Sequence, residues 1–263
     1  MFAAALLAFS IGHGATGHVR AARATRVVRP AALVVVDPGH GGKDEGASHA
    51  GVSEAMINLA VARELTALLR AQGYRVMLTR DEACRSEWVV GAQAHAPGRP
   101  RRDCRVNLRD RVLSGVGLHP SVFLSLHCDH YADASVRGPR TYYGEGSDIQ
   151  RALAVDIQRE LDRFRDRPFE AAAAKHFLLL AQPQTPAVTV EMGFLTNPAE
   201  RQKLGTRAYQ REIADAVARG LERYARSHPL RPAPPVDPVE VDRLWQRKHY
   251  HHASGGGSRV PRG

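Results

Sequence analysis

Two histidines of this 263-residue chain lie at or just after the ends of apolar segments. His40 stands in an Asp-Pro-Gly-His-Gly-Gly turn after the run Leu33 to Val36, and His127 follows the run Val122 to Leu126. Glu54 opens a helical pattern whose apolar residues recur every three or four positions, which places its carboxylate on the buried face, where an unpaired charge is costly. Two imidazoles and one carboxylate with an open fourth position form the ligand set of a catalytic zinc site. The pattern predicts one Zn²⁺ ion held by His40, Glu54 and His127.

A second glutamate, Glu191, follows the apolar run Ala187 to Val190 and has the same strand-end position as the two histidines. A carboxylate beside a metal can accept a proton from the attacking water and deliver it to a leaving amine. An edge glutamate paired with an arginine would show the same pattern, and this strand alone does not separate the two interpretations. Glu191 is therefore the candidate catalytic residue.

Cys128 lies directly after His127, which raises the alternative of a structural zinc site. Such a site normally has four protein ligands and favours cysteine. Successive side chains of a strand point to opposite faces, so Cys128 is expected to point away from His127. We interpret it as a small buried apolar residue. A serine hydrolase is not indicated, because the chain contains no Gly-x-Ser-x-Gly turn.

The elements that must position these side chains alternate between strand and helix, which predicts an α/β fold. Most strand candidates are continuous apolar runs, as expected for strands covered on both faces. We expect a single domain with a mostly parallel, twisted sheet of about six strands, flanked by helices on both faces. The predicted strands are Leu33 to Val36, Tyr74 to Leu78, Val122 to Leu126, Thr141 to Tyr143, Phe177 to Leu180 and Ala187 to Val190.

Helices are predicted where an apolar stripe meets a cap or a stop. The first is capped by Ser53 and ends at Gly73, and Asn197 begins another with Pro198 and Glu200 in a capping-box pattern. The remaining predicted helices are Val106 to Ser114, Ser147 to Phe164 with Ile149 among its inward residues, and Thr206 to Arg226 with Ile213, Val217, Leu221 and Tyr224 inward.

The net charge of +10 comes mostly from the two ends of the chain. Residues 1 to 30 hold four basic and no acidic side chains, and residues 228 to 263 hold six basic against three acidic. No nucleic-acid motif is present, so we predict no nucleic-acid partner. The apolar run FAAALLAFSIG predicts an export signal over residues 1 to 24 and is too short to span a membrane. We expect an exported protein, located in the periplasm or the cell envelope.

After this signal, residues 25 to 30 are predicted to be a linker and residues 31 to 227 the catalytic domain. Residues 228 to 263, rich in Pro, Gly and His, are predicted to form a disordered tail. Its histidines, His249, His251 and His252, have no neighbouring partner ligands and are interpreted as solvated. Cys84 and Cys104 could form a disulfide in an oxidising compartment, but the sequence leaves their pairing open.

Six segments in order along the chain resemble the zinc-dependent N-acetylmuramoyl-L-alanine amidases of the type called amidase 3. They are VVVDPGHGGKDEGA, the helix from Glu54, YRVMLTR, NLRDR, FLSLHCDH and VTVEMGFLTNPAE, and they extend from about Leu33 to Tyr224. The resemblance implies that His40, Glu54 and His127 bind zinc and that Glu191 is the catalytic glutamate. It also implies the substrate, peptidoglycan, cleaved between N-acetylmuramic acid and L-alanine in cell-wall remodelling or cell separation.

The chain departs from this family pattern after the third ligand, where Cys128 and Asp129 replace the usual Ala-Asn and add a negative charge near the metal. The stretch between His127 and Glu191 has room for one clear helix, whereas some periplasmic members carry an extra helix there that plugs the active site. We therefore expect an open site. An activator protein is possible as a partner but is not required by the sequence.

Two other functions stay open on the sequence. A zinc peptidase on a similar fold would cut another amide of the stem peptide. A catalytically inactive amidase-like domain would only bind peptidoglycan, but such a domain has no need of all three ligands together with Glu191.

Overall fold

The computed structural model describes residues 32–41, 44–80, 119–174, 180 and 184–232. Their main feature is a six-stranded sheet with the strand order β4-β1-β5-β8-β6-β7. The strands are β1 (Leu33–Pro38), β4 (Arg75–Leu78), β5 (Val122–Asp129), β6 (Arg140–Gly144), β7 (Ala172–Ala174) and β8 (Ala187–Phe194). All neighbours are parallel except β6 and β8, which pair antiparallel. A short hairpin of β2 (Ser48–His49) and β3 (Val52–Ser53) precedes the first helix.

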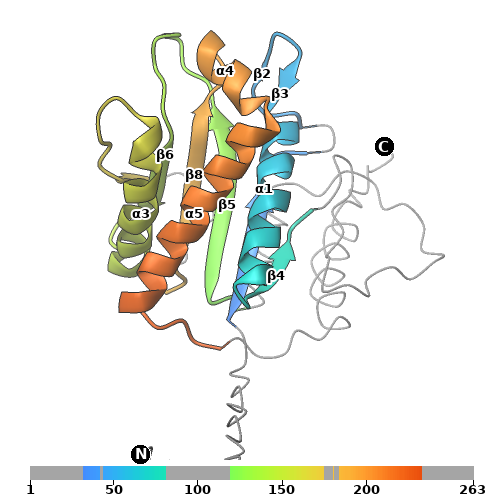
Figure 1. Cartoon of the computed structure of the whole chain (residues 1–263). Coiled ribbons are helices and arrows are strands. Elements are labelled where there is room, and N and C mark those ends of the chain that lie inside the picture. The colour runs from blue at the N-terminus through green and yellow to red at the C-terminus, as the bar shows by residue number, and fades with distance from the viewer. Residues whose placement is uncertain (1–31, 42–43, 81–118, 175–179, 181–183, 233–263) are drawn as a thin grey trace, which may run out of the picture.

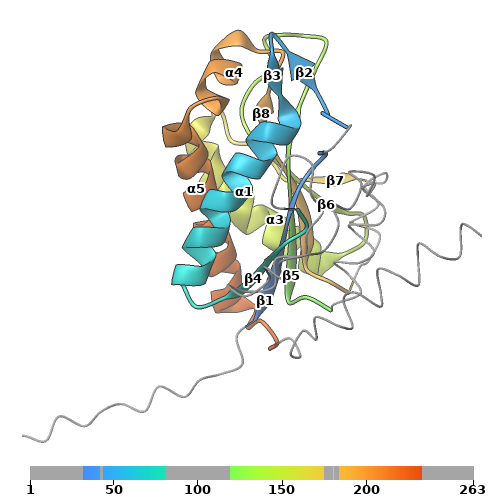
Figure 2. The same cartoon turned by 90° about the vertical axis from the view of Figure 1, so that its right-hand side faces the viewer.

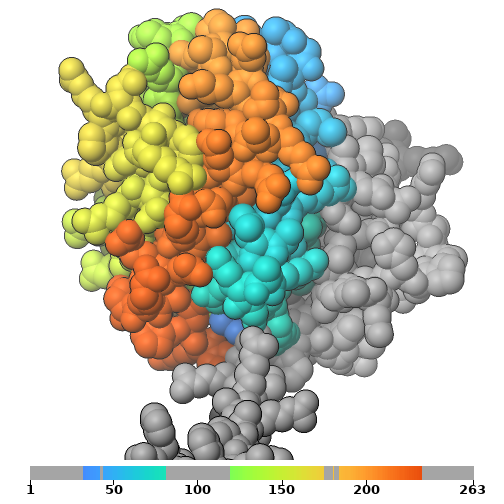
Figure 3. All heavy atoms as spheres, in the orientation of Figure 1, coloured from blue at the N-terminus to red at the C-terminus, as the bar shows by residue number. Residues whose placement is uncertain are grey.

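Three long helices cover one face of this sheet (Figures 1 and 2). They are α1 (Glu54–Ala71), α3 (Asp148–Leu161) and α5 (Arg207–Ser227), and α5 packs between the other two (Figure 3). The short η1 (Asp162–Phe164) continues α3, and α4 (Pro198–Leu204) precedes α5. The predicted α/β fold with a mostly parallel sheet of about six strands is confirmed. Helices on the second face are not tested within the described residues, and the helix predicted over Val106 to Ser114 lies outside them.

The two faces of the sheet differ in character because side chains alternate along each strand. Val34, Leu124 and Val190 belong to a buried apolar core that they share with α1, α3 and α5. Ser125 lies one position after Leu124 and Asp37 lies three positions after Val34, so both are buried on the other face, where the Ser125 hydroxyl donates to Asp37 (3.0 Å). The parallel strands β1, β5 and β8 end at one edge of the sheet, and the candidate site lies at that edge.

One prediction about α3 was wrong, and one short strand was missed. Ile149 is 36% exposed, because Gln150 occupies the inward position of the first turn. The amide of Gln150 donates to the Thr185 carbonyl (3.1 Å) and its oxygen accepts from the Gly144 N–H (2.8 Å). The short strand β7 was not predicted, since three alanines carry no strand pattern. The predicted strand Phe177 to Leu180 lies outside the described residues except for Leu180, which is buried and not in a strand.

The predicted helix ends are correct in position, but two of them differ in their contacts. Ser53 precedes α1 without a capping hydrogen bond from its side chain, and its hydroxyl donates instead to the Glu45 carbonyl (3.3 Å). Asn197 caps α4 as predicted, by accepting from the Glu200 N–H (3.0 Å). The Glu200 carboxylate does not close a capping box, because it accepts from the N–H groups of Gly138 and Phe194, both at 2.8 Å.

The chain stays in contact with the domain after α5 ends. Leu230 packs against the apolar core, and the Ser121 hydroxyl donates to the Arg231 carbonyl (2.6 Å). The rest of the predicted tail, the predicted export signal, and both Cys84 and Cys104 lie outside the described residues. Within the described ranges, no helix combines the length and the apolar character needed to cross a bilayer.

Candidate metal centre

The turn after β1 brings His40 over the end of β5. The N–H of Gly39 donates to the Leu126 carbonyl (2.9 Å), which fixes the turn beside the residue that precedes His127. A Cβ atom on Gly39 would lie 2.2 Å from the His127 ring, so only glycine permits this approach. His40 itself has φ of 59°, a left-handed conformation that is uncommon for residues other than glycine. Such backbone strain is often found at functional sites.

Glu54, the first residue of α1, is buried among hydrogen-bond donors. Its Oε2 accepts from the Ala47 N–H (2.7 Å), and its Oε1 accepts from the Cys128 N–H (3.1 Å) and the Asn58 amide (3.3 Å). Burial alone would raise the pKa of Glu54, but hydrogen bonds from His127 and His40 outweigh it and hold this pKa far below its ordinary value. The carboxylate is therefore ionised and held in one orientation, as a metal ligand must be.

The three predicted ligands meet at this carboxylate. His40 Nε2 lies 3.2 Å and His127 Nδ1 lies 3.0 Å from Glu54 Oε1. The two imidazole rings meet edge to face with centroids 4.9 Å apart, and one donor atom from each of the three residues falls within 4.8 Å of the others. Two nitrogens and one oxygen at this spacing fit a single zinc ion, whose bonds to such donors are about 2.0–2.2 Å long.

A fourth side chain orients the first ligand. Asp44 places its Oδ2 3.0 Å from Nδ1 of His40, on the side of the ring away from Glu54. A carboxylate in this position fixes the tautomer of a metal-bound histidine and makes it a better ligand. Burial would lower the pKa of His40, but its contacts with Glu54 and Asp44 outweigh burial and raise it.

Glu191 lies beside this cluster, one strand away from His127. The two residues are register partners in the parallel pair β5 and β8. Glu191 is only 6% exposed, and its Oε2 is buried without a hydrogen-bond partner among the described residues. Burial, followed by the charges of Asp129 and Glu54, raises its pKa well above the ordinary value. The alternative of an edge glutamate paired with an arginine is not favoured, because β8 is an interior strand and Glu191 forms no ion pair within the described part of the chain.

A protein-family model described as N-acetylmuramoyl-L-alanine amidase matches residues 34–223. The chain belongs to this amidase family. The matched region holds all three predicted ligands and Glu191. Amidases of this family depend on zinc in general, and the cluster of His40, Glu54 and His127 is placed to hold such an ion.

Individual amidases resemble the chain over the same region. It is 31% identical to the germination-specific N-acetylmuramoyl-L-alanine amidase of Bacillus subtilis, over 73% of this chain and 79% of the relative. It is 29% identical to the probable cell wall amidase LytH of Staphylococcus saprophyticus, again over 73% of this chain but only 57% of that relative's length. The CwlD amidase of Clostridioides difficile, solved in complex with the GerS lipoprotein, superposes with a TM-score of 0.63 and 28% identity, over 74% of this chain and 99% of that one.

Three buried residues that support the centre of this amidase were not singled out as functional residues. Arg80 donates to the carbonyls of Pro38 (2.9 Å), Gly39 (2.9 Å) and Ala55 (2.7 Å), and so ties the His40 turn to the start of α1. Asn58 donates to both the Gly39 carbonyl (3.2 Å) and Glu54. Asp37 accepts from Thr79 and Ser125 below the turn. Arg80 and Asn58 fall in segments that resemble the family, and this resemblance could have pointed to them as functional residues.

Cys128 is fully buried in the apolar core, as predicted, and burial raises the pKa of its thiol. Its side chain takes no part in the cluster of candidate ligands, which argues against a structural zinc site that uses cysteine. Asp129 follows at the end of β5, and its charge contributes to the raised pKa of Glu191. The extra acidity predicted near the metal therefore acts on the candidate catalytic residue.

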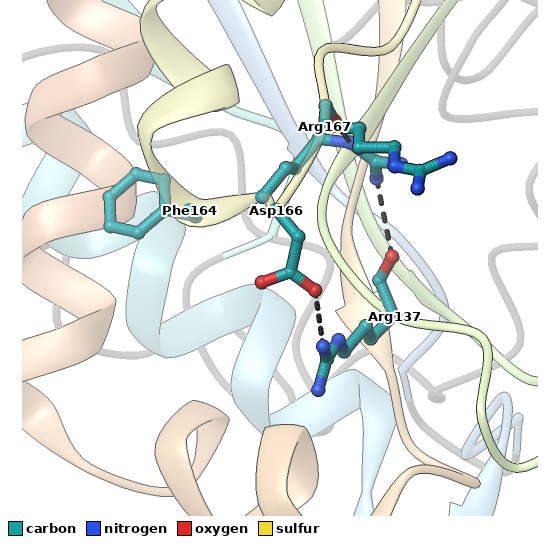
Figure 4. A pocket seen from close by; sticks show the side chains of 5 residues that line it. Arg137, Phe164, Asp166 and Arg167 are labelled. Atoms are coloured by element: carbon teal, nitrogen blue, oxygen red, sulfur yellow. Dashed lines mark hydrogen bonds and ion pairs between the residues drawn. The ribbon is translucent and has the colours of Figure 1, made fainter.

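A shallow hollow of about 210 Å³ lies away from this centre (Figure 4). It is lined by Arg137, Phe164, Arg165, Asp166 and Arg167, and none of these belongs to the candidate ligand set. Asp166 pairs with Arg137 across it. The candidate metal site at the ends of β1, β5 and β8 shares no residue with this hollow.

Proposed function

We propose that the chain hydrolyses the amide bond between N-acetylmuramic acid and L-alanine in peptidoglycan. One zinc ion is held by His40, Glu54 and His127, and Glu191 carries the proton. The observation that carries this proposal is that two imidazoles and a carboxylate converge within 4.8 Å, beside a buried carboxylate with an unpartnered oxygen, in a member of the amidase family. These donors leave a fourth position for water or substrate.

A zinc ion at these three side chains would supply a Lewis acid that polarises the scissile carbonyl. The protein's own contribution centres on Glu191. Its raised pKa means that the carboxylate readily accepts a proton from the attacking water and can later release it to the leaving amine of L-alanine. Glu54 does the opposite, since its lowered pKa keeps it ionised throughout.

The direct test is mass spectrometry of purified peptidoglycan after digestion. The zinc-loaded protein should release intact peptides that begin with free L-alanine, and either a chelator or Glu191→Ala should abolish this release. Added zinc should restore the chelated protein but not the variant. Cleavage within the stem peptide would favour the zinc peptidase, and binding of peptidoglycan without any cleavage would favour the inactive domain. Unchanged digestion with the chelator and with the variant would refute the mechanism.

We place the protein outside the cytoplasmic membrane, in the periplasm or cell envelope, where its substrate lies. The predicted export signal and the cell-wall amidases among its relatives support this location. A fusion of residues 1–30 to a reporter that is active only after export tests it. An inactive reporter, with an established signal as the positive control, would contradict it.

We also propose that the site works without an activator. The described residues between His127 and Glu191 include one α-helix, α3, and it packs against α5 on the helical face. The CwlD amidase was solved with the GerS lipoprotein, so a partner deserves a direct comparison. Digestion rates should be the same with and without a candidate lipoprotein, and a strict requirement for one would overturn this expectation.

A further inference from the structure

Three neighbouring strands present polar side chains at one level of the sheet. His127 on β5 is the register partner of Glu191 on β8, and Glu191 is the register partner of Arg140 on β6. Directly opposite residues of adjacent strands point to the same face. Strands are about 4.8 Å apart, so the backbone of Arg140 lies about 10 Å from that of His127, on the far side of Glu191.

The guanidinium of Arg140 is held by aromatic rings and not by a carboxylate. Its Cζ lies 4.8 Å from the centroid of Phe194 and 5.3 Å from that of Phe169. Its Nε is buried without a hydrogen-bond partner, and Arg140 forms no ion pair within the described residues, Glu191 included. Stacking on aromatic rings fixes a guanidinium in place while leaving its charge available to an anion.

Tyr142 extends this surface along β6. It lies two residues beyond Arg140 on the same face, and its ring packs edge to face on Phe169 with centroids 6.3 Å apart. Burial raises the pKa of Tyr142, a side-chain hydrogen bond from Arg140 and the charge of Arg140 oppose this effect, and the charges of Glu191 and Asp129 add to it. Arg140, Tyr142 and Phe169 therefore form one surface beside the candidate catalytic glutamate, which we call the β6 wall.

The other arginines near the β6 wall are engaged within the protein. Arg137 pairs with Asp166. Arg165 has its Cζ 5.2 Å from the Phe169 centroid and donates to the carbonyls of Arg167 (3.1 Å) and Pro139 (3.1 Å). Figure 4 shows the side chains of Arg137 and Asp166 turned toward each other. Arg140 is thus the cation at this level of the sheet that is best placed to receive an external carboxylate.

We propose that Arg140 binds a carboxylate of the stem peptide, carried by the residue that follows L-alanine. This inference rests on the proposed function. The sugar beside the scissile amide offers hydroxyl and acetamido groups, whereas a second residue that is a glutamate joined through its side chain offers a free α-carboxylate. An extended peptide advances about 3.3 Å per residue, so two or three residues from the scissile amide span the distance from the centre to the β6 wall. The peptide then lies over β6, and the glycan lies toward β1.

The test uses the full-length, zinc-loaded protein and a pair of synthetic muramoyl peptides. The two peptides differ only in whether the α-carboxylate of the second residue is free or amidated. Wild type should prefer the free acid, and Arg140→Gln should lower kcat/KM for the acid by about 10- to 100-fold, mainly through KM, as expected for a lost charged hydrogen bond. The same variant should lower kcat/KM for the amide far less than for the acid, and Arg140→Lys should restore part of the loss on the acid.

Arg167→Gln provides the matched control, because it removes the same charge from the rim of the hollow and should alter neither substrate. Thermal unfolding of each variant verifies that the fold is retained. Equal losses by Arg140→Gln on the two peptides, or no preference of wild type for the acid, would overturn the assignment of Arg140. If wild type cleaves neither these peptides nor peptidoglycan itself, the proposed function fails instead.

Discussion

Two buried glutamates, Glu54 at the start of α1 and Glu191 on β8, lie near the same edge of the sheet in opposite surroundings. Glu54 accepts hydrogen bonds from two backbone N–H groups and an amide, and both histidines contact it. Glu191 has a buried oxygen without a partner in the described structure and is approached by the like charges of Asp129 and Glu54. The pKa of Glu54 is lowered, and the pKa of Glu191 is raised.

The difference shows how one residue type serves two roles. A carboxylate surrounded by donors stays ionised and fixed, which suits a metal ligand. A carboxylate in an apolar, negatively charged environment holds a proton more readily, which suits a group that accepts a proton and then gives it up. The following variants test whether this separation of roles is real, beginning with the largest expected effect.

Glu191→Gln should lower kcat on peptidoglycan by about 10²- to 10⁴-fold, the usual contribution of a general acid or base. The variant keeps nearly the same shape, and all three predicted zinc ligands remain. Zinc content, measured by mass spectrometry of the metal, should therefore equal that of wild type. Loss of zinc together with activity would mean that Glu191 is a ligand, and the comparison with Glu54 would then fail.

The two glutamates should also differ in their effect on the stability of the metal-free protein. Glu54→Gln removes the charge from several hydrogen bonds and should lower the free energy of unfolding by about 1.5–3 kcal/mol. Glu191→Gln removes a charge that burial disfavours and should leave stability at neutral pH unchanged or higher. Urea unfolding with a chelator present measures both. The same sign of change for the two variants would contradict the account.

Asp44→Ala tests whether a residue that is not itself a predicted ligand strengthens zinc binding. Asp44 contacts Nδ1 of His40, so its loss should weaken zinc binding by about 10- to 100-fold. Competition with a chelator of known affinity gives the value. Asp166→Ala is the control, since it removes a surface carboxylate that pairs with Arg137 away from the centre. Equal effects of the two variants would indicate a general charge effect and not orientation of His40.

Cys128→Ala should have the smallest effect. The thiol is buried in the apolar core, so its removal should cost about 1 kcal/mol of stability or less, comparable to the loss of one buried methyl group. Zinc stoichiometry and kcat should match wild type. A fall in zinc content would show that the thiol takes part in the centre.

The sequence identified the candidate ligands because each lies next to the boundary of a predicted strand or helix. Parallel strands end at a common edge, so the apolar runs before His127 and Glu191 already imply that these residues are neighbours. The resemblance to the amidase family then assigned their roles. Strand alternation likewise predicted the buried position of Cys128 correctly.

The supporting residues could not be derived in this way. Arg80 acts by binding backbone carbonyls of two separate segments, and no pattern along the chain reports such contacts. Glu200 has the spacing of a capping box, but its carboxylate binds N–H groups of β8 and of a distant loop. Gln150 takes the inward position that the apolar periodicity assigned to Ile149, because its side chain forms tertiary hydrogen bonds there.

The different roles of the two glutamates require that Glu54 binds the metal and that Glu191 does not. An anomalous difference map, collected at the zinc absorption edge from crystals grown with zinc, tests it most directly. One peak is expected, about 2.0–2.2 Å from donor atoms of His40, Glu54 and His127, with the Glu191 carboxylate beyond bonding distance. A peak bonded to Glu191, or a peak away from these three residues, would contradict it.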